Sequence, residues 1–183
     1  MTRSNEVNIP LHVGEASEIS YGAYGAPPAT DFGPLARDRI PVRSMAAGDL
    51  RALVAIDRRV TGHERAGYFE RKLADALTGS DVCVSLVAEL DDVPVGFVMA
   101  RVDFGEFGRV ETTAVLDTIG VDPDYQDRGV GRALISQLLV NLGTLRVEIV
   151  RTEVDWNDRE LLAYLDRSGF RPSQQLCFDQ FLT

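Results

Sequence analysis

Cysteine and histidine are scarce in this chain of 183 residues, which contains two of each. The two cysteines, Cys83 and Cys177, lie in apolar, strand-like stretches where a buried free thiol is the ordinary finding. No set of His, Cys and carboxylate residues has the spacing of a zinc site. The sequence therefore predicts neither a disulfide-stabilised protein nor a metalloprotein.

Basic residues and long apolar runs are also lacking. The formal net charge of -9 is opposite to what a nucleic-acid partner requires, and it is compatible with a cationic or amine ligand. No apolar run approaches the roughly 20 residues that cross a bilayer. Residues 1–10 have neither the basic cluster nor the apolar stretch of a secretory signal. We therefore expect no nucleic acid, no membrane and a cytoplasmic location.

Apolar periodicity is weak in residues 1–39, where glycine and proline interrupt the chain repeatedly. We interpret this segment as an extended N-terminal arm. It is either a partly disordered tail, which the usual behaviour of termini favours, or a segment that packs on a second subunit through Tyr21, Tyr24 and Phe32. Residues 40–183 are long enough for one domain with a substantial core.

Residues 40–183 alternate between strand-like and helix-like patterns, and Gly143 and Gly169 are placed to end two of the helices. The order is a helical opening, an antiparallel run, a strand-helix-strand unit, a further helix and a final strand, which predicts an α/β (α+β) domain. The predicted strands are residues 40–43, 82–90, 95–104, 113–121, 145–154 and 176–182, and the predicted helices are residues 50–57, 68–77, 130–142 and 158–168.

The most informative segment joins the strand at 113–121 to the helix that follows it. Gly129 and Gly131 open this helix, whose first backbone N–H groups have no partner within the helix. Glycine lets an anion approach these amides, and the helix dipole adds about half a positive charge there. Arg128 and Arg132 add full charges. The segment therefore predicts a phosphate site.

Two common phosphate motifs are absent from this loop. The dinucleotide pattern G-x-G-x-x-G fails at Leu134, and the ATP loop G-x-x-x-x-G-K-[ST] does not occur. Instead, the run Gln126-x-x-Gly129-x-Gly131, preceded by Val121-Asp122-Pro123, resembles the [QR]-x-x-G-x-[GA] signature of GNAT superfamily acetyltransferases. Residues 157–170, which close in Gly169-Phe170, resemble the later helix of that family. The resemblance covers residues 40–183 and leaves the arm unexplained.

This resemblance implies the GNAT acyltransferase fold, with a central mixed, mostly antiparallel sheet that is flanked by helices and splayed between two strands. Acetyl-CoA is then the cosubstrate and lies where the two strands part. The family's cofactor contacts map onto the backbone of Ile119, Gly120 and Val121, onto the loop and helix start formed by Gln126, Asp127, Arg128, Gly129, Val130, Gly131, Arg132 and Ala133, and onto Asn157.

Acetyl transfer to an amine also needs a base, because a lysine-like amine has a pKa near 10.4 and is protonated at neutral pH. Glu153 is the first candidate, since its distance back from Gly169 matches a glutamate in family members that acetylate ribosomal-protein N-termini. Asp117, on the cofactor strand, is the second. The alternative for each is a solvated or salt-bridged carboxylate at a strand end.

The general acid of many relatives is a tyrosine at the position that Leu165 occupies here. Tyr164 is one residue earlier, which turns its side chain by about 100 degrees on a helix. It either reaches the thiol from another angle or packs, and helical geometry favours packing. Asn157, with Glu160 three residues later, fits a helix cap as well as the family's CoA-contacting asparagine.

The resemblance thus implies an N-acetyltransferase in which a primary amine attacks acetyl-CoA directly in a ternary complex. The amine belongs to a small molecule, a peptide N-terminus or a lysine, and the loops at 58–67, with His63 and Glu64, and at 104–109 would select it. The missing tyrosine keeps a second class open, a catalytically silent acyl-CoA-binding module that acts as a sensor or partner subunit. A structural protein with an accidental glycine loop is the third. A homodimer is common in this fold.

Overall fold

The computed structural model describes residues 40–79, 82–104, 111–175 and 179–182. The predicted arm over residues 1–39 and Cys177 lie outside these residues. Cys83, at the first position of a strand, is half-buried rather than buried. None of the described helices is long and apolar enough to span a membrane.

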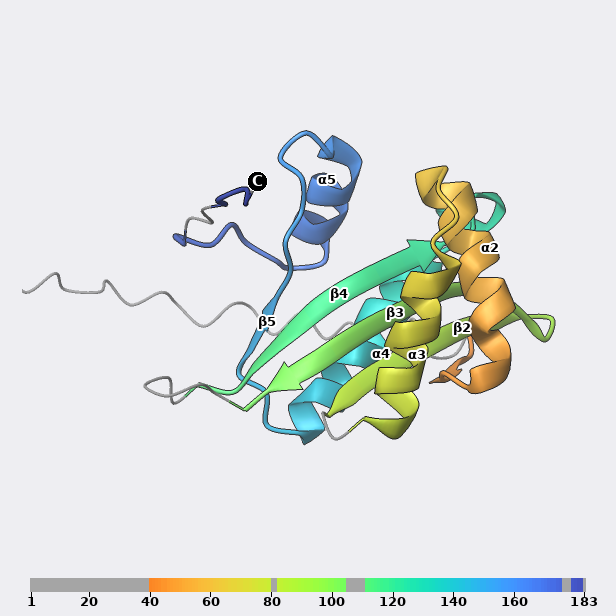
Figure 1. The fold of residues 1–183 in the computed structure, drawn as a ribbon, viewed down its shortest axis with the longest axis horizontal. Helices are drawn as coiled ribbons and strands as arrows, with labels where there is room; N and C mark the ends of the chain where they lie inside the picture. The colour runs from red at the N-terminus through yellow and green to blue at the C-terminus, as the bar shows by residue number, and fades with distance from the viewer. Residues whose placement is uncertain (1–39, 80–81, 105–110, 176–178, 183) are drawn as a thin grey trace, which may run out of the picture. The chain divides into compact units, whose positions relative to one another are not determined.

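The described residues contain a five-stranded sheet in which the strands follow one another in sequence order (Figure 1). Each neighbouring pair is antiparallel except β4 and β5, which are parallel. The sheet confirms the predicted mixed, mostly antiparallel architecture. Its strands are β1 (Val42–Ser44), β2 (Cys83–Leu90), β3 (Val93–Asp103), β4 (Thr113–Val121) and β5 (Ile149–Arg151).

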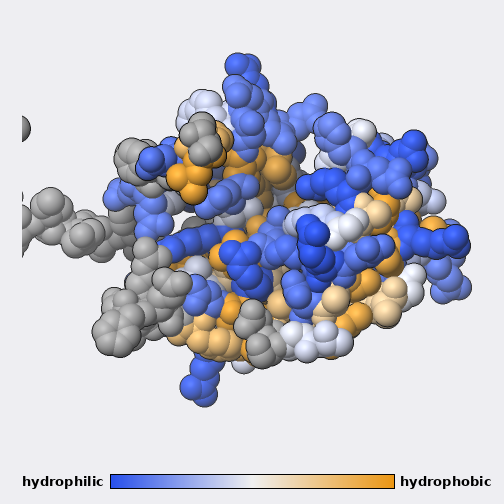
Figure 2. All heavy atoms as spheres, viewed as in Figure 1, coloured by the Kyte–Doolittle hydropathy of each residue, from blue (hydrophilic) through white to orange (hydrophobic). Residues whose placement is uncertain are grey.

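Helices cover both faces of the sheet (Figure 1). The short helix η1 (Ala47–Asp49), α2 (Leu50–Thr61) and α3 (Ala66–Thr78) lie on one face, and α4 (Val130–Thr144) lies on the other. Hydrophilic side chains gather over α2 and α3 (Figure 2). Along β3, Phe97 and Met99 pack with α2 and α3, whereas Val98 and Ala100 pack with α4, which is the period of two expected for a strand buried on both faces. Helices η2 (Pro123–Tyr125) and α5 (Arg159–Arg167) complete the described elements.

The end of α4 differs from the prediction. Gly143 lies inside the helix, which continues to Thr144, and the left-handed residue that ends it is Arg146, with φ 59°. The Val147 N–H then donates to the Leu142 carbonyl at 3.1 Å. Because these residues close the helix, the strand predicted over 145–154 is reduced to β5.

The C-terminal half holds two further differences. Asp158, and not Asn157, caps α5, since its side chain accepts a hydrogen bond from the Leu161 N–H at 3.0 Å. Gly169 follows the helix with φ 91°, as predicted. Of the strand predicted over 176–182, residues 179–182 are irregular, and residues 176–178 lie outside the described part.

Position 120 of β4 has to be glycine because of its partner on the neighbouring strand β3. It pairs with Phe97 of β3, and a Cβ at Gly120 would lie 2.7 Å from the Phe97 ring. That ring is fixed in turn, because it packs edge-to-face on Phe69 of α3 with ring centroids 5.4 Å apart. The ring covers the glycine, so the strand has no room for a side chain at this position.

We therefore expect Gly120→Ala to lower the free energy of unfolding by about 1–3 kcal/mol, the usual cost of overpacking a core. Chemical denaturation measures the change. The matched control is Gly67→Ala on α3, where an added Cβ meets no atom of the described residues within 4 Å and where alanine favours the helix by about 1 kcal/mol. An unchanged denaturation midpoint in Gly120→Ala would contradict this account of the Phe97 ring.

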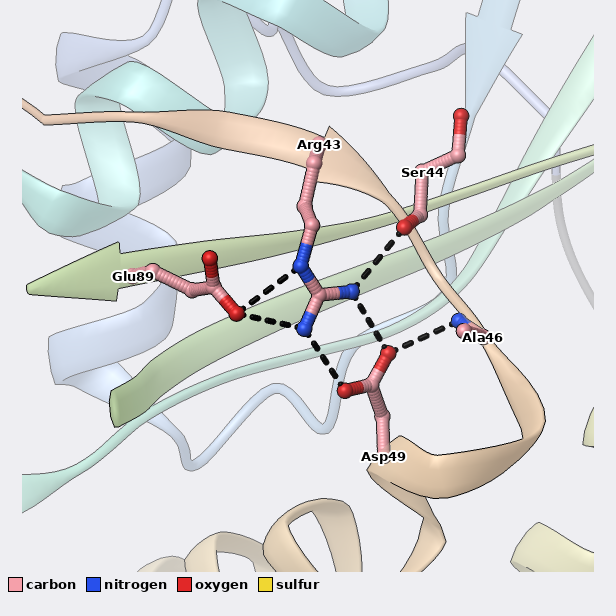
Figure 3. Close-up of polar contacts among 5 residues, drawn as sticks. All are labelled: Arg43, Ser44, Ala46, Asp49 and Glu89. Atoms are coloured by element: carbon pink, nitrogen blue, oxygen red, sulfur yellow. Dashed lines mark hydrogen bonds and ion pairs between the residues drawn. The ribbon is translucent and has the colours of Figure 1, made fainter. Parts of the chain in front are cut away.

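Arg43 of β1 ties three elements together (Figure 3). Its guanidinium donates to both carboxylate oxygens of Asp49 at 2.8 Å each, and its Nε donates to Glu89 of β2 at 2.8 Å. Asp49 is only 6% exposed and also accepts the Ala46 N–H at 2.7 Å. The hydrogen bonds from Arg43 are the main cause that holds the pKa of Asp49 below its ordinary value. The cluster fixes the start of the α2 layer against the sheet edge.

We expect Arg43→Gln to lower the free energy of unfolding at neutral pH by about 1–3 kcal/mol, the cost of leaving a buried polar group without its partner. The Arg43 side chain is 38% exposed, so the loss lies toward the lower end. Because the pKa of the Asp49 carboxyl is lower in the folded than in the unfolded protein, the group stabilises the fold at pH values above its pKa in the unfolded protein. This contribution to the free energy of unfolding is lost as the pH falls through the pKa of the folded protein. Denaturation at several acidic pH values should therefore show the free energies of unfolding of wild type and Arg43→Gln converging as the pH falls. A difference that stays constant with pH would contradict the role given to the pair of Arg43 and Asp49.

Candidate functional site

The sheet opens between β4 and β5. The two strands pair only through Thr113 to Val115 on β4, while β4 itself continues to Val121. Beyond this pairing, one more hydrogen bond joins β4 to the chain after β5: the Thr152 hydroxyl donates to the Leu116 carbonyl at 3.1 Å. Beyond it the chain turns away toward α5 (Figure 1). In the described part of the chain, no strand covers the outer edge of β4 from residue 117 onward, as the predicted splay requires.

The backbone direction along this edge follows from one hydrogen bond. The Asp122 N–H donates to the Val95 carbonyl at 2.9 Å, so this residue points toward β3. Because successive residues of an antiparallel strand alternate in direction, the backbone groups of Ile119 and Val121 point to the open edge. These two residues carry the donors and acceptors that an extended ligand along β4 would meet.

The loop after β4 has the geometry of an anion site. Asp127 and Gly129 both have left-handed backbones, with φ 58° and φ 87°. Left-handed residues in such a loop turn neighbouring N–H groups to one side, and α4 starts directly after them. Ala133 is the exception among the predicted amides, because its N–H already donates to the Gly129 carbonyl at 2.9 Å. The Ala133 amide is therefore already used within the helix and is not available to an anion.

Two arginines give this loop its shape and charge. The Arg128 guanidinium lies over the Tyr125 ring, 5.2 Å from its centroid, which holds a cation beside the amides. Arg59, from the last turn of α2, contacts Asp122 at 2.6 Å and Asp124 at 2.9 Å. Sequence reasoning missed Arg59, because its partners lie more than 60 residues away and no spacing indicates them. The contacts fasten the loop to α2.

Tyr164 of α5 lies against the first turn of α4. A Cβ at Gly131 would be 2.9 Å from the Tyr164 hydroxyl oxygen, so this glycine makes room for the phenol. The hydroxyl is buried and has no hydrogen-bond partner among the described residues. Burial raises its pKa to about 12, and the nearby Ser168 side chain opposes only part of this rise. The Ser168 hydroxyl donates to the Tyr164 backbone carbonyl at 2.9 Å and not to the phenol. With a pKa of about 12, the phenol is protonated at neutral pH and can donate a hydrogen bond.

Two residues near Tyr164, Leu165 and Asn157, were considered as site residues in the sequence. Leu165, at the position of the family's acid, is a core residue with no ionisable group. Asn157 is exposed just before the helix and does not cap it. Of the two interpretations left open for Asn157, only the cofactor contact therefore stays a prediction.

A polar cavity of about 640 Å³ lies where β4 and β5 separate. Both candidate bases line it, so the structure brings together Asp117 of β4 and Glu153 from the segment that follows β5. Neither His63 nor Glu64 lines this cavity. The charged residues around it are Arg101, Asp103, Glu111, Asp117, Arg151 and Glu153.

The two carboxylates differ in their surroundings. Asp117 is the extra residue at a bulge in the β3–β4 register, and its side chain is 12% exposed. One oxygen contacts Lys72 Nζ of α3 at 2.7 Å, and the other accepts from Arg101 of β3. Glu153 is exposed at the cavity and has no ion pair within the described residues. Glu153 is therefore the carboxylate with oxygens free to take a proton from a ligand.

The loop between α2 and α3 is fixed by an ion pair whose carboxylate is buried and whose arginine is partly exposed. Asp57 is 3% exposed, and Arg65 donates to its two oxygens at 2.5 and 2.9 Å. Arg65 also lies over the Tyr68 ring, 5.2 Å from its centroid. His63 and Glu64, at the exposed tip, do not take part in this pair. Among the residues that the structure describes, no group of His, Cys, Asp and Glu side chains could hold a metal ion.

Comparison with known proteins gives a family match and several similar folds. The model of the Acetyltransferase (GNAT) family matches residues 50–170. A mycothiol acetyltransferase from Propionibacterium freudenreichii subsp. shermanii is 27% identical over 132 residues, which cover 67% of this chain and 40% of that protein. The chain therefore spans less than half the length of this curated relative.

Two solved structures share the fold at low sequence identity. The aminoglycoside acetyltransferase AAC(6')-Iy, in complex with a CoA bisubstrate analogue, matches with a TM-score of 0.67 and 16% identity over 79% of this chain and 99% of that chain. The aminoglycoside 6'-N-acetyltransferase AAC(6')-Ih from Acinetobacter baumannii matches with a TM-score of 0.64 and 14% identity over 79% and 99%. At this identity the likeness establishes the fold and not the acceptor.

Proposed function

This chain belongs to the GNAT acetyltransferase family, and from that premise we propose that it transfers an acetyl group from acetyl-CoA to a primary amine. One observation carries the proposal. The uncovered edge of β4 runs from the loop at 126–133, which we propose binds phosphate, to the carboxylate-lined cavity. A single ligand along this edge can therefore place a phosphate on the loop and an acyl group at the cavity.

The residues of the loop fit the pyrophosphate of acetyl-CoA. The amides that follow Asp127 and Gly129 are donors without side-chain obstruction, and Arg128 supplies a positioned charge. Ile119 and Val121 offer backbone groups to the amides of the pantetheine arm. Gln126, after η2, and Asn157, before α5, stay predicted contacts. When bound, acetyl-CoA supplies an acetyl thioester that a neutral amine can attack.

The protein's part in the chemistry is to remove a proton from the amine. We assign this step to Glu153, directly or through water, because its oxygens are not engaged by a described cation. The ammonium first gives one proton through Glu153 to solvent. As the neutral nitrogen then bonds to the acetyl carbon, the carbon–sulfur bond breaks, the nitrogen loses its second proton to solvent, and one proton from solvent neutralises the sulfur, so that one proton is released overall. A thiol with a pKa near 8.5 leaves without strong acid assistance, so the absence of a tyrosine at Leu165 is compatible with turnover.

Asp117 and Tyr164 receive other roles. Asp117 is held by Lys72 and Arg101 and therefore orders the wall of the cavity. Tyr164 lies beside Gly131, at the phosphate end of the opening, which favours cofactor binding over proton donation to the leaving sulfur. The acceptor is a small molecule, a peptide N-terminus or a lysine. The surplus of carboxylates over arginines around the cavity favours an acceptor with more than one positive charge.

A screen of thiol release tests this proposal. Purified protein with acetyl-CoA should release thiol in the presence of diamines or basic peptides, and more slowly with neutral monoamines. The competing function is a silent acyl-CoA-binding module. It is supported if acetyl-CoA binds and no amine in the screen raises thiol release above the rate without protein.

A further inference from the structure

The cavity between β4 and β5 contains a cation that the proposed chemistry does not use. Arg151, the last residue of β5, is half-buried and lines this cavity. Within the described part of the chain its guanidinium has no ion pair, whereas Arg101, the other arginine of the lining, is engaged by Asp117. A guanidinium can bind a carboxylate through two parallel hydrogen bonds. Arg151 is therefore available to a negatively charged group of a ligand.

The register of the sheet places Arg151 close to the proposed base. Val115 of β4 pairs with Arg101 on one side and with Arg151 on the other, and paired residues point to the same face of a sheet. Glu153 follows two residues later and lines the same cavity. At about 3.3 Å per residue, the Cα atoms of Arg151 and Glu153 are about 7 Å apart. One short ligand can therefore contact both side chains.

Acidic residues line the cavity on the other side of Arg151. Asp103 of β3 pairs with Thr113, which lies two residues from the row of Arg151 and on the side away from Glu153. Glu111 precedes Thr113 by two residues and also lines the cavity. Along the strands the lining is therefore negative at Glu153, positive at Arg151 and negative again at the two residues beyond it. A ligand whose charges follow the complementary order is favoured.

This order of charges fits one class of amine. An α-amino acid with an amine at the end of its side chain has one ammonium group at that end, and a carboxylate and a second ammonium group at the other. Four or five single bonds of about 1.5 Å separate the side-chain nitrogen from the α-carbon and span roughly 5–6 Å, which is close to the separation of Glu153 and Arg151 along the chain. A polyamine has no group for Arg151. A lysine within a protein has neither the free carboxylate nor the second ammonium group.

We infer that the acceptor is a free α-amino acid whose side chain ends in an amine, with the side-chain nitrogen at Glu153, the carboxylate on Arg151 and the α-ammonium group toward the acidic residues beyond. This inference rests on the proposed function and names the class of its substrate. The side-chain ammonium exchanges two protons for the acetyl group, the sulfur of CoA takes up one proton, and one proton is released overall. Arg151 selects and orients the acceptor and takes no part in the proton transfer.

Initial rates of thiol release with two matched pairs of acceptors test this inference. The pairs are L-lysine with cadaverine and L-ornithine with putrescine, in which the second compound lacks only the carboxylate. In at least one pair, kcat/KM of the wild type should be about tenfold or more higher for the amino acid, the order expected for a charge-assisted hydrogen bond. The corresponding ω-amino acid, which lacks only the α-amine, should also have a lower kcat/KM. Fragmentation of the product in a mass spectrometer should place the acetyl group on the side-chain nitrogen.

A charge reversal tests the role of Arg151. Arg151→Glu places a negative charge where the carboxylate would bind, so the preference should be inverted in favour of the diamine. Both acceptors are compared in one sample of protein, so their ratio does not depend on the fraction that is folded. The matched control is Arg51→Glu, which changes an exposed arginine of α2 that is not among the described residues of the cavity lining, and it should keep the wild-type ratio.

The inference is overturned if kcat/KM of the wild type is no lower for the diamine than for the amino acid in both pairs, or if the ω-amino acid is used as well as the α-amino acid. It is also overturned if Arg151→Glu keeps the wild-type preference or if the acetyl group is found on the α-nitrogen. Acetyl transfer is observed in each of these cases, so the proposed function stands. If neither the amino acids nor the amines of the screen raise thiol release, the proposed function fails together with the inference.

Discussion

Glu153→Gln should lower kcat about 100-fold or more at neutral pH and leave the affinity for acetyl-CoA unchanged. The amide has nearly the shape of the carboxylate but cannot accept a proton from the amine, and a positioned base contributes about 10²–10⁴-fold. A primary amine becomes neutral without help as the pH approaches its pKa near 10.4. The deficit of the variant should therefore shrink as the pH rises, which initial rates of thiol release between neutral and alkaline pH would record.

Asp117→Asn is the matched control, because it changes the other carboxylate of the same cavity. It removes the charge that Lys72 and Arg101 share, so we expect a lower free energy of unfolding and a smaller loss of kcat than in Glu153→Gln. The assignment of the base would be reversed by the opposite result, in which Asp117→Asn loses kcat more strongly and the deficit closes at high pH.

Gly129→Glu should weaken acetyl-CoA binding about 100-fold or more while the protein stays folded. The residue has φ 87°, so any side chain costs about 1–2 kcal/mol of backbone strain. Among the described residues other than its chain neighbours, only the Ile40 Cδ1 atom lies within 4 Å of an added Cβ, at 3.8 Å. The larger effect comes from a carboxylate placed against the pyrophosphate, since like charges in contact cost several kcal/mol.

Gly129→Asn separates the two effects. Asparagine tolerates the left-handed backbone better than other residues and brings no charge, so this variant should keep most of the affinity. Calorimetric titration of acetyl-CoA gives the dissociation constants, and circular dichroism checks the fold. Equal affinities of wild type and Gly129→Glu would place the pyrophosphate elsewhere.

The elements of the fold could be predicted from the sequence where a local pattern determines them. The strands at 83–90 and 113–121 and the helix that starts at Val130 follow from apolar periodicity and from the glycines that precede the helix. The opening between β4 and β5 followed only from the family resemblance. That the loop binds a phosphate stays a prediction. The structure shows left-handed backbone in this loop at Gly129, where glycine tolerates it, and also at Asp127, which no sequence pattern indicates.

The side chains of the cavity could be predicted only in part. That Asp117 is engaged by Lys72 and Arg101 depends on contacts across 45 and 16 residues, which leave no periodic signal. The glycine at position 120 is explained by Phe97 on the neighbouring strand, which the sequence does not align with it. The predicted strand over 145–154 failed for a similar reason, because the helix before it ends at Arg146 and not at the more obvious Gly143.

The most direct test of acetyl transfer is a mass measurement after one incubation. Purified protein, acetyl-CoA carrying an isotope-labelled acetyl group and a diamine are mixed, and the masses of the amine and of the intact protein are determined. Direct attack in a ternary complex predicts the label on the nitrogen of the amine and no mass change of the protein. If the diamines and basic peptides of the screen all stay unlabelled while calorimetry still detects acetyl-CoA binding, the transferase is contradicted and a silent acyl-CoA-binding module is left.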